Sequence, residues 1–212
     1  MIRILIADDH AIVRQGLRQL LAASSDFQVL GEATNGHEVL ARLRELPCDV
    51  VVLDLSMPGR SGIDLIKQIK LEHPKLRILV FTMHEEQQYA VRTIKAGASG
   101  YLTKESASDL LPAAIRKIAS GGAYITPAVA EQLALDVMPH SSAAPHLALS
   151  DREFQVMRML VAGTSVTAIA EELHLSVKTI STHKARLMQK LGLASQADLV
   201  RYAMSHDLGV DS

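Results

Sequence analysis

Several residue types are scarce in this chain, and each scarcity argues against a class of protein. There is no tryptophan, 3% of the residues are aromatic, and the single cysteine, Cys48, cannot form an internal disulfide. No apolar run approaches the roughly 18 residues of a membrane span, and aspartates follow the first apolar run too early for a signal peptide. We therefore expect a cytoplasmic protein without a membrane partner, in which Cys48 packs beside an apolar strand.

Charge balance and length set two further limits. Lysine and arginine total 22, aspartate and glutamate total 23, and the formal net charge is -1. This balance argues against a protein that binds nucleic acid over its whole surface, although a chain with a balanced total charge can still carry a local basic surface. At 212 residues the chain is long enough for two hydrophobic cores, so we expect two domains.

The first part of the chain predicts an open α/β domain. Short apolar runs such as "IRILIA", "DVVVLD" and "RILVFT" alternate with stretches of helical spacing such as "GHEVLARLREL" and "GIDLIKQIKLEH". Strands that are apolar nearly throughout are typical of a parallel sheet covered on both faces. We expect a flavodoxin-like, doubly wound domain with five parallel strands over residues 1–122.

The composition changes after this domain. Residues 123–147 combine a short helical stretch with "MPHSSAAPH", which lacks a periodic apolar pattern and indicates a linker. Residues 148–212 show helical spacing without a strand signal. They predict a small all-α domain.

Polar side chains follow the strands of the first domain where each strand ends. Asp8 and Asp9 follow the first strand, Asp54 the third and Lys104 the fifth, while Thr82 ends the fourth. Ligands of open α/β sheets bind at this edge, and the strand order 2-1-3-4-5 would bring the three aspartates into one pocket. Like charges disfavour one another's ionisation, so a divalent cation is the simplest compensation. Oxygen ligands favour a hard ion, and we expect Mg²⁺.

An aspartate in such a pocket can also act as a nucleophile and form an aspartyl phosphate. Lys104 would then lie against one phosphoryl oxygen, and the Thr82 hydroxyl would donate to another. Each residue alone has an ordinary structural explanation, such as Asp8 or Asp9 capping the next helix. Their shared placement on one sheet edge favours the chemical interpretation.

These residues stand in motifs of a known family. The segments "ADDH", "LDLSMPGRSGIDLI", "VFTMH" and "GASGYLTKES" resemble the receiver domain of two-component response regulators. The resemblance implies that Asp54 is the phosphoacceptor. It also implies that Mg²⁺ is bound by Asp9, Asp54 and the main-chain carbonyl of Ser56, with support from Asp8.

The same resemblance implies a switch. Thr82 matches the family's switch threonine, Lys104 its phosphate-pairing lysine and Tyr101 its switch aromatic. Phosphorylation would draw Thr82 inward, Tyr101 would follow, and the surface of the fourth helix, fifth strand and fifth helix would change. Two positions depart from the common pattern, because Met83 replaces a small residue and Glu105 replaces a proline. Met83 predicts narrower access to the phosphoryl group, and without proline a cis bond after Lys104 cannot be assumed.

The second domain contains two helices joined by a tight turn, within "VTAIAEELHLSVKTISTHKARLMQKL", and Ser176 is placed as the N-cap of the second. From Val177 to Leu191 there are four basic residues and no acidic one. Such a helix suits contact with a phosphate backbone. On charge alone, an ordinary solvated helix is the alternative.

Residues 148 to about 207 resemble the LuxR-type (NarL/FixJ) helix-turn-helix domain, with "LSDREFQVMRMLVAG" as its opening and "SVKTISTHKARLMQKLGL" as its recognition helix. The resemblance implies that the recognition helix enters the major groove and that "SQADLVRYAMSH" dimerises on a two-fold symmetric site. The DNA-facing candidates are Lys178, Thr179, Ser181, Thr182, Lys184 and Arg186. The candidate dimerisation residues are Ala197, Leu199, Val200 and Ala203.

Together these features predict a transcriptional response regulator that a sensor histidine kinase phosphorylates at Asp54 and that binds double-stranded promoter DNA as a homodimer. Beyond slow self-dephosphorylation it is not expected to be an enzyme. The alternative, a Mg²⁺-dependent aspartyl-phosphate phosphohydrolase, commonly carries a DxD motif, whereas Asp8 and Asp9 are adjacent here. A regulator that senses a small molecule would need an apolar ligand cavity. The pocket predicted here is lined by carboxylates instead, which argues against such a regulator.

Overall fold

The computed structural model describes residues 1–58, 62–83, 87–137, 144–206 and 208. The chain forms two compact units, Met1–Leu135 and Asp136–Ser212. The domain boundaries after residues 122 and 147 stay predictions, and positions 138–143 of the expected linker lie outside the described residues. Within the described ranges, no helix has the length and apolar character needed to cross a bilayer.

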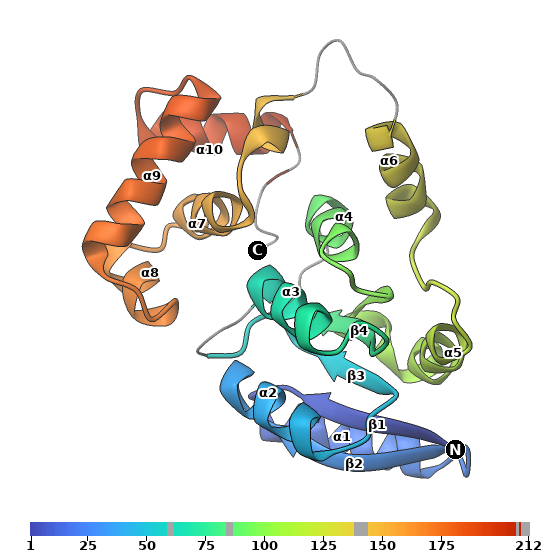
Figure 1. Ribbon diagram of the computed structural model, residues 1–212. Helices are drawn as coiled ribbons and strands as arrows, with labels where there is room; N and C mark the ends of the chain where they lie inside the picture. Colours follow the sequence, from blue (N-terminus) through green and yellow to red (C-terminus); the bar gives the residue numbers. More distant parts are fainter. Residues whose placement is uncertain (59–61, 84–86, 138–143, 207, 209–212) are drawn as a thin grey trace. The chain divides into compact units, whose positions relative to one another are not determined.

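The first unit is built on one parallel sheet of order β2-β1-β3-β4-β5, as the sequence predicted (Figure 1). Register aligns the ends of β1 and β3, because Ala7 pairs with Leu53, whereas β4 runs two residues past the partner of Leu53, Val80. Residues that follow β1 and β3 therefore begin at the same level. The strands are β1 (Ile2–Ala7), β2 (Phe27–Ala33), β3 (Val50–Leu53), β4 (Arg77–Thr82) and β5 (Gly100–Thr103).

Helices alternate with these strands and cover both faces of the sheet, as expected for right-handed crossovers between parallel strands (Figure 1). A short 3-10 helix, η1, follows β5 directly. The helical elements of this unit are α1 (Ala11–Ala22), α2 (Gly36–Glu45), α3 (Gly62–Glu72), α4 (Gln87–Lys95), η1 (Lys104–Ser106) and α5 (Ala107–Ala119), and α6 (Pro127–Val137) begins in this unit and ends two residues into the second.

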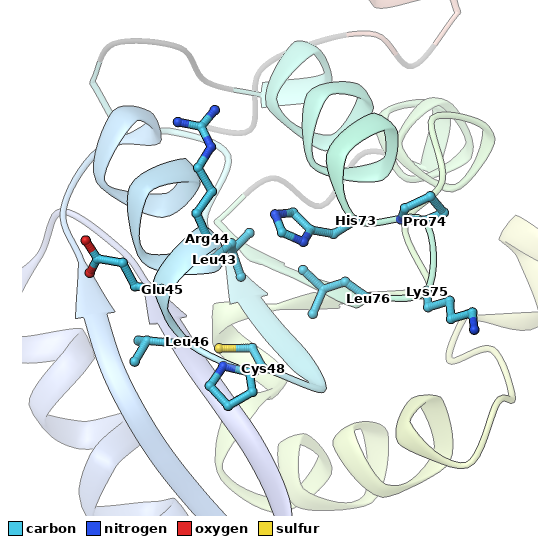
Figure 2. Close-up of a pocket in the computed structure, with 10 residues that line it drawn as sticks. Leu43, Arg44, Glu45, Leu46, Cys48, His73, Pro74, Lys75 and Leu76 are labelled. Carbon is cyan, nitrogen blue, oxygen red and sulfur yellow. The ribbon is translucent and has the colours of Figure 1, made fainter.

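Cys48 lies at the amino-terminal edge of the sheet, opposite to the edge that carries Asp54. It lines a cavity of about 610 Å³ together with Leu43 at the end of α2 and His73 and Leu76 between α3 and β4 (Figure 2). Burial raises the pKa of the Cys48 thiol to about 11. The thiol therefore stays protonated near neutral pH and is a poor nucleophile, which agrees with a packing role.

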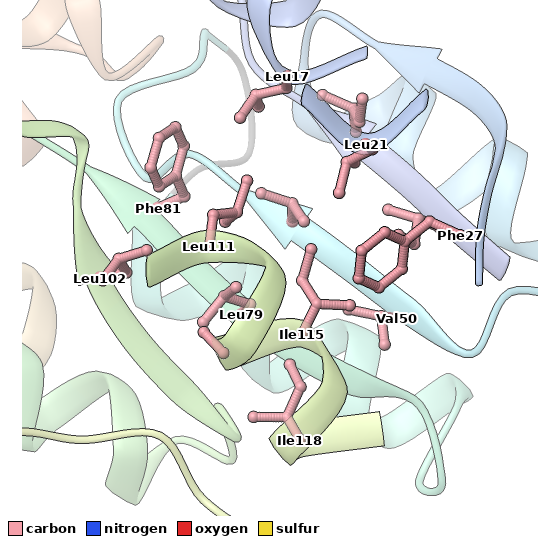
Figure 3. Close-up of a cluster of buried hydrophobic side chains, with 14 residues drawn as sticks. Leu17, Leu21, Phe27, Val50, Leu79, Phe81, Leu102, Leu111, Ile115 and Ile118 are labelled. Carbon is pink, nitrogen blue, oxygen red and sulfur yellow. The ribbon is translucent and has the colours of Figure 1, made fainter. Parts of the chain in front are cut away.

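The core of the first unit fixes the positions of the strands. One face of the sheet packs on α1 and α5, and alternate residues of the central strands point into this layer (Figure 3). Burying one such Leu, Ile or Phe side chain contributes about 1.5–3 kcal/mol. The buried cluster consists of Ile4, Ile6, Leu17, Leu21, Phe27, Val50, Val52, Leu79, Phe81, Leu102, Leu111, Ala114, Ile115 and Ile118.

The segment after α5 returns to the outer edge of β5. The main-chain nitrogen of Tyr101 donates to the Tyr124 carbonyl at 2.9 Å, and the nitrogen of Tyr124 donates to the Ser99 carbonyl at 3.0 Å. This bridge requires glycine at position 100, because a Cβ atom there would lie 3.0 Å from the Tyr124 carbonyl and 2.9 Å from Leu79 Cδ1. The main chain that leads to α6 is therefore hydrogen-bonded to the strand that carries Tyr101.

The second unit is helical throughout its described residues, as predicted. The α-helices α7 to α10 start at serine N-caps, including Ser176, whose hydroxyl accepts a hydrogen bond from the Thr179 nitrogen at 3.0 Å. In the turn between α8 and α9, His174 adopts a left-handed φ of 52°. The elements are η2 (Pro145–Ala148), α7 (Asp151–Val161), α8 (Val166–Glu172), α9 (Val177–Leu191) and α10 (Gln196–Ser205).

The contact at Gly100 makes a testable prediction about stability. We expect Gly100→Ala to lower the free energy of unfolding by about 1–3 kcal/mol, because the added methyl group meets main-chain atoms that cannot rotate away. In the control Gly16→Ala, the methyl group enters open space on α1, and stability should rise by about 0.5–1 kcal/mol. Urea unfolding followed by circular dichroism measures both. A Gly100→Ala protein as stable as wild type would contradict the close-packing argument.

Candidate functional site

An ion-pair network joins three strands at the carboxyl-terminal edge of the sheet. Asp8 follows β1, Asp54 follows β3, and Lys104 opens η1 directly after β5. The Lys104 Nζ atom lies 2.7 Å from Asp8 Oδ2 and 2.8 Å from Asp54 Oδ2, and both aspartate side chains are 1% exposed. The structure thus brings together three of the residues that the sequence placed on this edge.

Burial and charge act on these groups in opposite directions. Burial raises the pKa of Asp54 more than the hydrogen bond and charge of Lys104 lower it, and the negative charge of Asp8 adds to the rise. Burial lowers the pKa of Lys104, but its hydrogen bonds and ion pairs with Asp54 and Asp8 outweigh this effect and raise the pKa. Lys104 is therefore held as a cation between two carboxylates.

A divalent cation fits the remaining donors. One ligand atom from each of Asp8, Asp9, His10 and Asp54 lies within 4.8 Å of the others. One lysine cannot compensate three carboxylates, so the site keeps an excess of negative charge that a cation would reduce. Three carboxylates are the ligands that Mg²⁺ prefers. The Ser56 nitrogen donates to Asp54 Oδ1 at 3.3 Å, which places the main chain of Ser56 beside the same carboxylate.

His10 is a member of this cluster that the sequence reasoning missed. Its Nδ1 atom lies 3.0 Å from Asp9 Oδ1 and 3.3 Å from Asp8 Oδ1. Arg14, one helical turn further on, donates from Nη1 to the Asp8 carbonyl at 2.8 Å and pairs with Glu32 at 2.9 Å. The signal was present in "ADDH", because a histidine directly after two candidate ligands is itself a candidate ligand.

The remaining candidates of the receiver lie on or beside the same edge. Thr82 at the end of β4 is fully buried, and Tyr101 on β5 is 7% exposed. Met83 is exposed, at 60%, so it stands at the surface next to Thr82. Glu105 is exposed, and no cis peptide bond occurs among the described residues. The roles of these residues in a switch stay predictions.

Helix α9 separates an apolar face from a basic one. Ile180, Leu187 and Leu191 are buried in the helical core. The six candidates for DNA contact lie off this face: Lys178, Ser181, Thr182 and Arg186 are exposed, and Thr179 and Lys184 are half-buried. Lys184 donates to Gln196 Oε1 at 3.0 Å, and the Thr182 hydroxyl donates to the Lys178 carbonyl at 2.9 Å.

The four candidate dimerisation residues of α10 differ in burial: two are buried and two reach the surface. Leu199 and Ala203 are 0% exposed and belong to the core of the second unit. Ala197 is exposed and Val200 is half-buried. A partner can therefore reach only Ala197 and Val200 without opening the helical core.

One basic residue of α9, Lys190, stabilises the packing of the second unit. Lys190 Nζ lies 2.7 Å from Glu153 Oε2 and 3.1 Å from the Ala148 carbonyl, which ties α9 to α7 and η2. Burial raises the pKa of Glu153, but hydrogen bonds from Lys190 and Ser150 outweigh this effect and leave the pKa below its usual value. Glu153 is therefore a buried anion that depends on its partners.

Both units match families of known sequence. The family described as response regulator receiver domain matches residues 4–116, and the family described as bacterial regulatory proteins, luxR family, matches residues 147–203. Response regulator GacA of Pseudomonas protegens is 38% identical over 208 residues, which cover 98% of each chain.

Solved structures of the RcsB response regulator are similar over nearly the whole chain. RcsB of Salmonella typhimurium is 33% identical with a TM-score of 0.74, over 96% of this chain and 97% of that one. A structure of two RcsB dimers bound to two parallel DNAs is 33% identical with a TM-score of 0.59, over 96% of this chain and 98% of that one.

The pair between Lys190 and Glu153 predicts a specific loss of stability. We expect Lys190→Ala to destabilise the second unit by about 1–3 kcal/mol, because it leaves the buried Glu153 without its cation. The matched control is Lys178→Ala, the same change at an exposed site of the same helix, which should stay within about 0.5 kcal/mol of wild type. Thermal unfolding of the full chain at neutral pH measures both.

The pH dependence follows from the lowered pKa of Glu153. A depressed acidic pKa contributes stability above the unfolded pKa, about 4.3 for glutamate, and that stability is lost as the pH falls through the folded value. The difference between wild type and Lys190→Ala should therefore shrink below about pH 4. An equal loss of stability for Lys190→Ala and Lys178→Ala at neutral pH would contradict the assignment.

Proposed function

Because this chain belongs to the NarL/FixJ family of two-component response regulators, we propose that it is a DNA-binding transcriptional regulator switched by phosphorylation of Asp54. A sensor histidine kinase is the proposed phosphoryl donor. The observation that carries this proposal is the Lys104 ammonium held at 2.8 Å from Asp54 and 2.7 Å from Asp8 beside Asp9 and His10. Family members of this kind are regulators rather than classical enzymes, so we propose no turnover beyond slow self-dephosphorylation.

The chemistry requires a nucleophile and a means of compensating incoming negative charge. Asp8, Asp9, Asp54 and the carbonyl of Ser56 would hold Mg²⁺, which neutralises charge on the phosphoryl group when bound. One oxygen of Asp54 forms the bond to phosphorus as the bond from phosphorus to the donor nitrogen breaks, and that nitrogen keeps the electron pair. Lys104 is already placed to move from the carboxylate to a phosphoryl oxygen.

The switch converts this local charge into a change of surface. A phosphoryl group adds close to two negative charges and three acceptor oxygens. Thr82 is fully buried at the end of the neighbouring strand, and we propose that its hydroxyl turns to donate to one of these oxygens. Tyr101, next in the sheet, would then adjust its packing. Because the nitrogen of Tyr101 is hydrogen-bonded to Tyr124, the change would reach the segment that leads to α6.

The output is proposed to be binding of double-stranded DNA by a homodimer. The RcsB relative has been solved as dimers bound to DNA. In this chain, α9 carries no acidic residue from Val177 to Leu191, and its basic face is exposed. We assign DNA contact to the six candidates of α9, and dimer contact to Ala197 and Val200, which reach the surface of α10.

Phosphorylation is tested by intact mass. Incubation of the wild type with Mg²⁺ and acetyl phosphate should add one phosphoryl group, and Asp54→Ala should add none because the nucleophile is missing. Lys104→Ala should react more slowly, since the arriving charge loses a partner. Mg²⁺ binding measured in parallel separates two kinds of failure. A wild type that binds Mg²⁺ without gaining mass either needs its own kinase or signals without phosphorylation, and one that binds none refutes the acidic site.

DNA binding is tested through its dependence on salt. We expect Arg186→Ala to weaken binding to mixed-sequence duplex DNA and to lower the slope of log affinity against log salt by about one, the effect of one lost phosphate contact. The control is Arg201→Ala, which removes the same charge from α10 at a side chain that is 77% exposed. Fluorescence anisotropy at several salt concentrations reports both slopes. Equal effects of the two variants would exclude a specific role for the α9 face.

A further inference from the structure

The outward face of α9 carries two short side chains, Thr182 and Ala185, each of which has a methyl group. Both residues are exposed, and because they lie three positions apart they share one side of the helix, away from its buried residues. Lys178 and Arg186 are also exposed, one turn before and one turn after Thr182. The face proposed to enter the groove therefore has a cation on either side of Thr182 and two methyl groups between its longer side chains.

The hydroxyl group of Thr182 is already bound within the helix. It donates to the main-chain carbonyl of Lys178 at 2.9 Å, the hydrogen bond that a threonine inside a helix can make to the preceding turn. A hydroxyl has one hydrogen, so this group cannot donate to a base while that bond is kept, and its oxygen is held against the main chain. The methyl group, on the other branch of Cβ, is the part of Thr182 that is left for contact outside the helix.

Methyl groups on a recognition helix favour one base. In the major groove, thymine presents a C5-methyl group that makes apolar contact with a threonine methyl or an alanine, whereas guanine and adenine present the donors and acceptors that Arg, Lys, Asn or Gln bind. Thr182 lies in the first half of α9 (Val177–Leu191), the part of a recognition helix that contacts base edges. Ala185 has no atom beyond Cβ and lets the helix come close to the bases. The pair is therefore suited to contact with a thymine.

We propose that Thr182 and Ala185 pack against the C5-methyl group of one thymine in each half-site of the DNA, so that α9 selects a T·A pair there. Thr182 is then a specificity-determining residue that acts through its methyl group and not through its hydroxyl group. The inference rests on the DNA binding of the proposed function and adds which base is read. Lys178 and Arg186, on either side of Thr182, supply the positive charge that holds the helix to the phosphate backbone.

The test begins with a defined DNA site, selected from a random duplex library by the full-length protein treated with acetyl phosphate and Mg²⁺. Each thymidine of the selected duplex is then replaced singly by deoxyuridine, which lacks only the C5-methyl group. We expect the replacement at one position in each half-site to weaken binding by about fourfold, the effect of returning one buried methyl group to water. Replacements outside the half-sites should leave the affinity unchanged. Fluorescence anisotropy at one fixed salt concentration measures each duplex.

Two variants of Thr182 separate the methyl group from the hydroxyl group. Thr182→Val keeps the methyl group and loses the hydroxyl, so it should still prefer thymine to uracil at the sensitive position. Thr182→Ser keeps the hydroxyl and its bond to the main chain but loses the methyl group, so it should lose most of this preference. Thr182 is exposed, and thermal unfolding of both variants checks that each is folded.

The results that would overturn the proposal can be told apart from a failure of DNA binding itself. If the wild type binds its selected duplex but no deoxyuridine replacement in a half-site weakens binding, then DNA binding stands and α9 does not read a thymine methyl group. If Thr182→Ser keeps the preference of the wild type for thymine, a group other than the Thr182 methyl reads that base. If no duplex is bound at any salt concentration, both the proposal and the DNA binding of the proposed function fail.

Discussion

Three strands of the receiver sheet meet at one ammonium group, that of Lys104. It compensates two carboxylates that are 1% exposed and that come from the ends of β1 and β3. Removing one partner of such a buried pair leaves an uncompensated charge and typically costs about 3–5 kcal/mol. The apolar layers above and below the sheet hold the strand ends in register, and this rigid frame keeps both carboxylates within reach of Lys104.

The same principle, a buried charge that depends on a distant partner, recurs in the second unit. Glu153 on α7 is paired with Lys190 on α9, so one basic residue of α9 is committed to the fold. The remaining cations of that helix lie on its outer side. A chain with a formal net charge of -1 can therefore present a basic face, because its charges are segregated by helix rather than spread evenly.

Much of this arrangement could be predicted from the sequence. The exceptions all depend on side-chain contacts that form only in the folded protein. The strand order, and the placement of Asp8, Asp54, Thr82 and Lys104 on one edge, follow from apolar runs and from the rule that ligands bind at the carboxyl ends of parallel strands. The contacts of the His10 imidazole with Asp8 and Asp9 could not be predicted, because they depend on the side-chain conformation adopted in the turn after β1.

The ion pair between Lys190 and Glu153 could not be predicted from the sequence either. Lys190 and Glu153 are 37 positions apart, and nothing in the charge pattern of α9 distinguishes Lys190 from its neighbours. The family resemblance of the last helix implies a dimer surface that includes Leu199 and Ala203, yet both are 0% exposed. A short helix with several apolar positions does not reveal which of them face the core, since this is decided by the helices against which it packs.

The bridge at Tyr124 bears on how this protein can self-associate. An open strand edge offers unpaired main-chain groups to a second chain, which can pair with them as an added strand. Tyr124 already binds the carbonyl of Ser99 and the nitrogen of Tyr101 at the start of β5, and Gly100 lets it come close. A second copy of this protein cannot add a strand at that bridge, because the main-chain groups there are already paired, so contacts between copies at this point would be made by side chains.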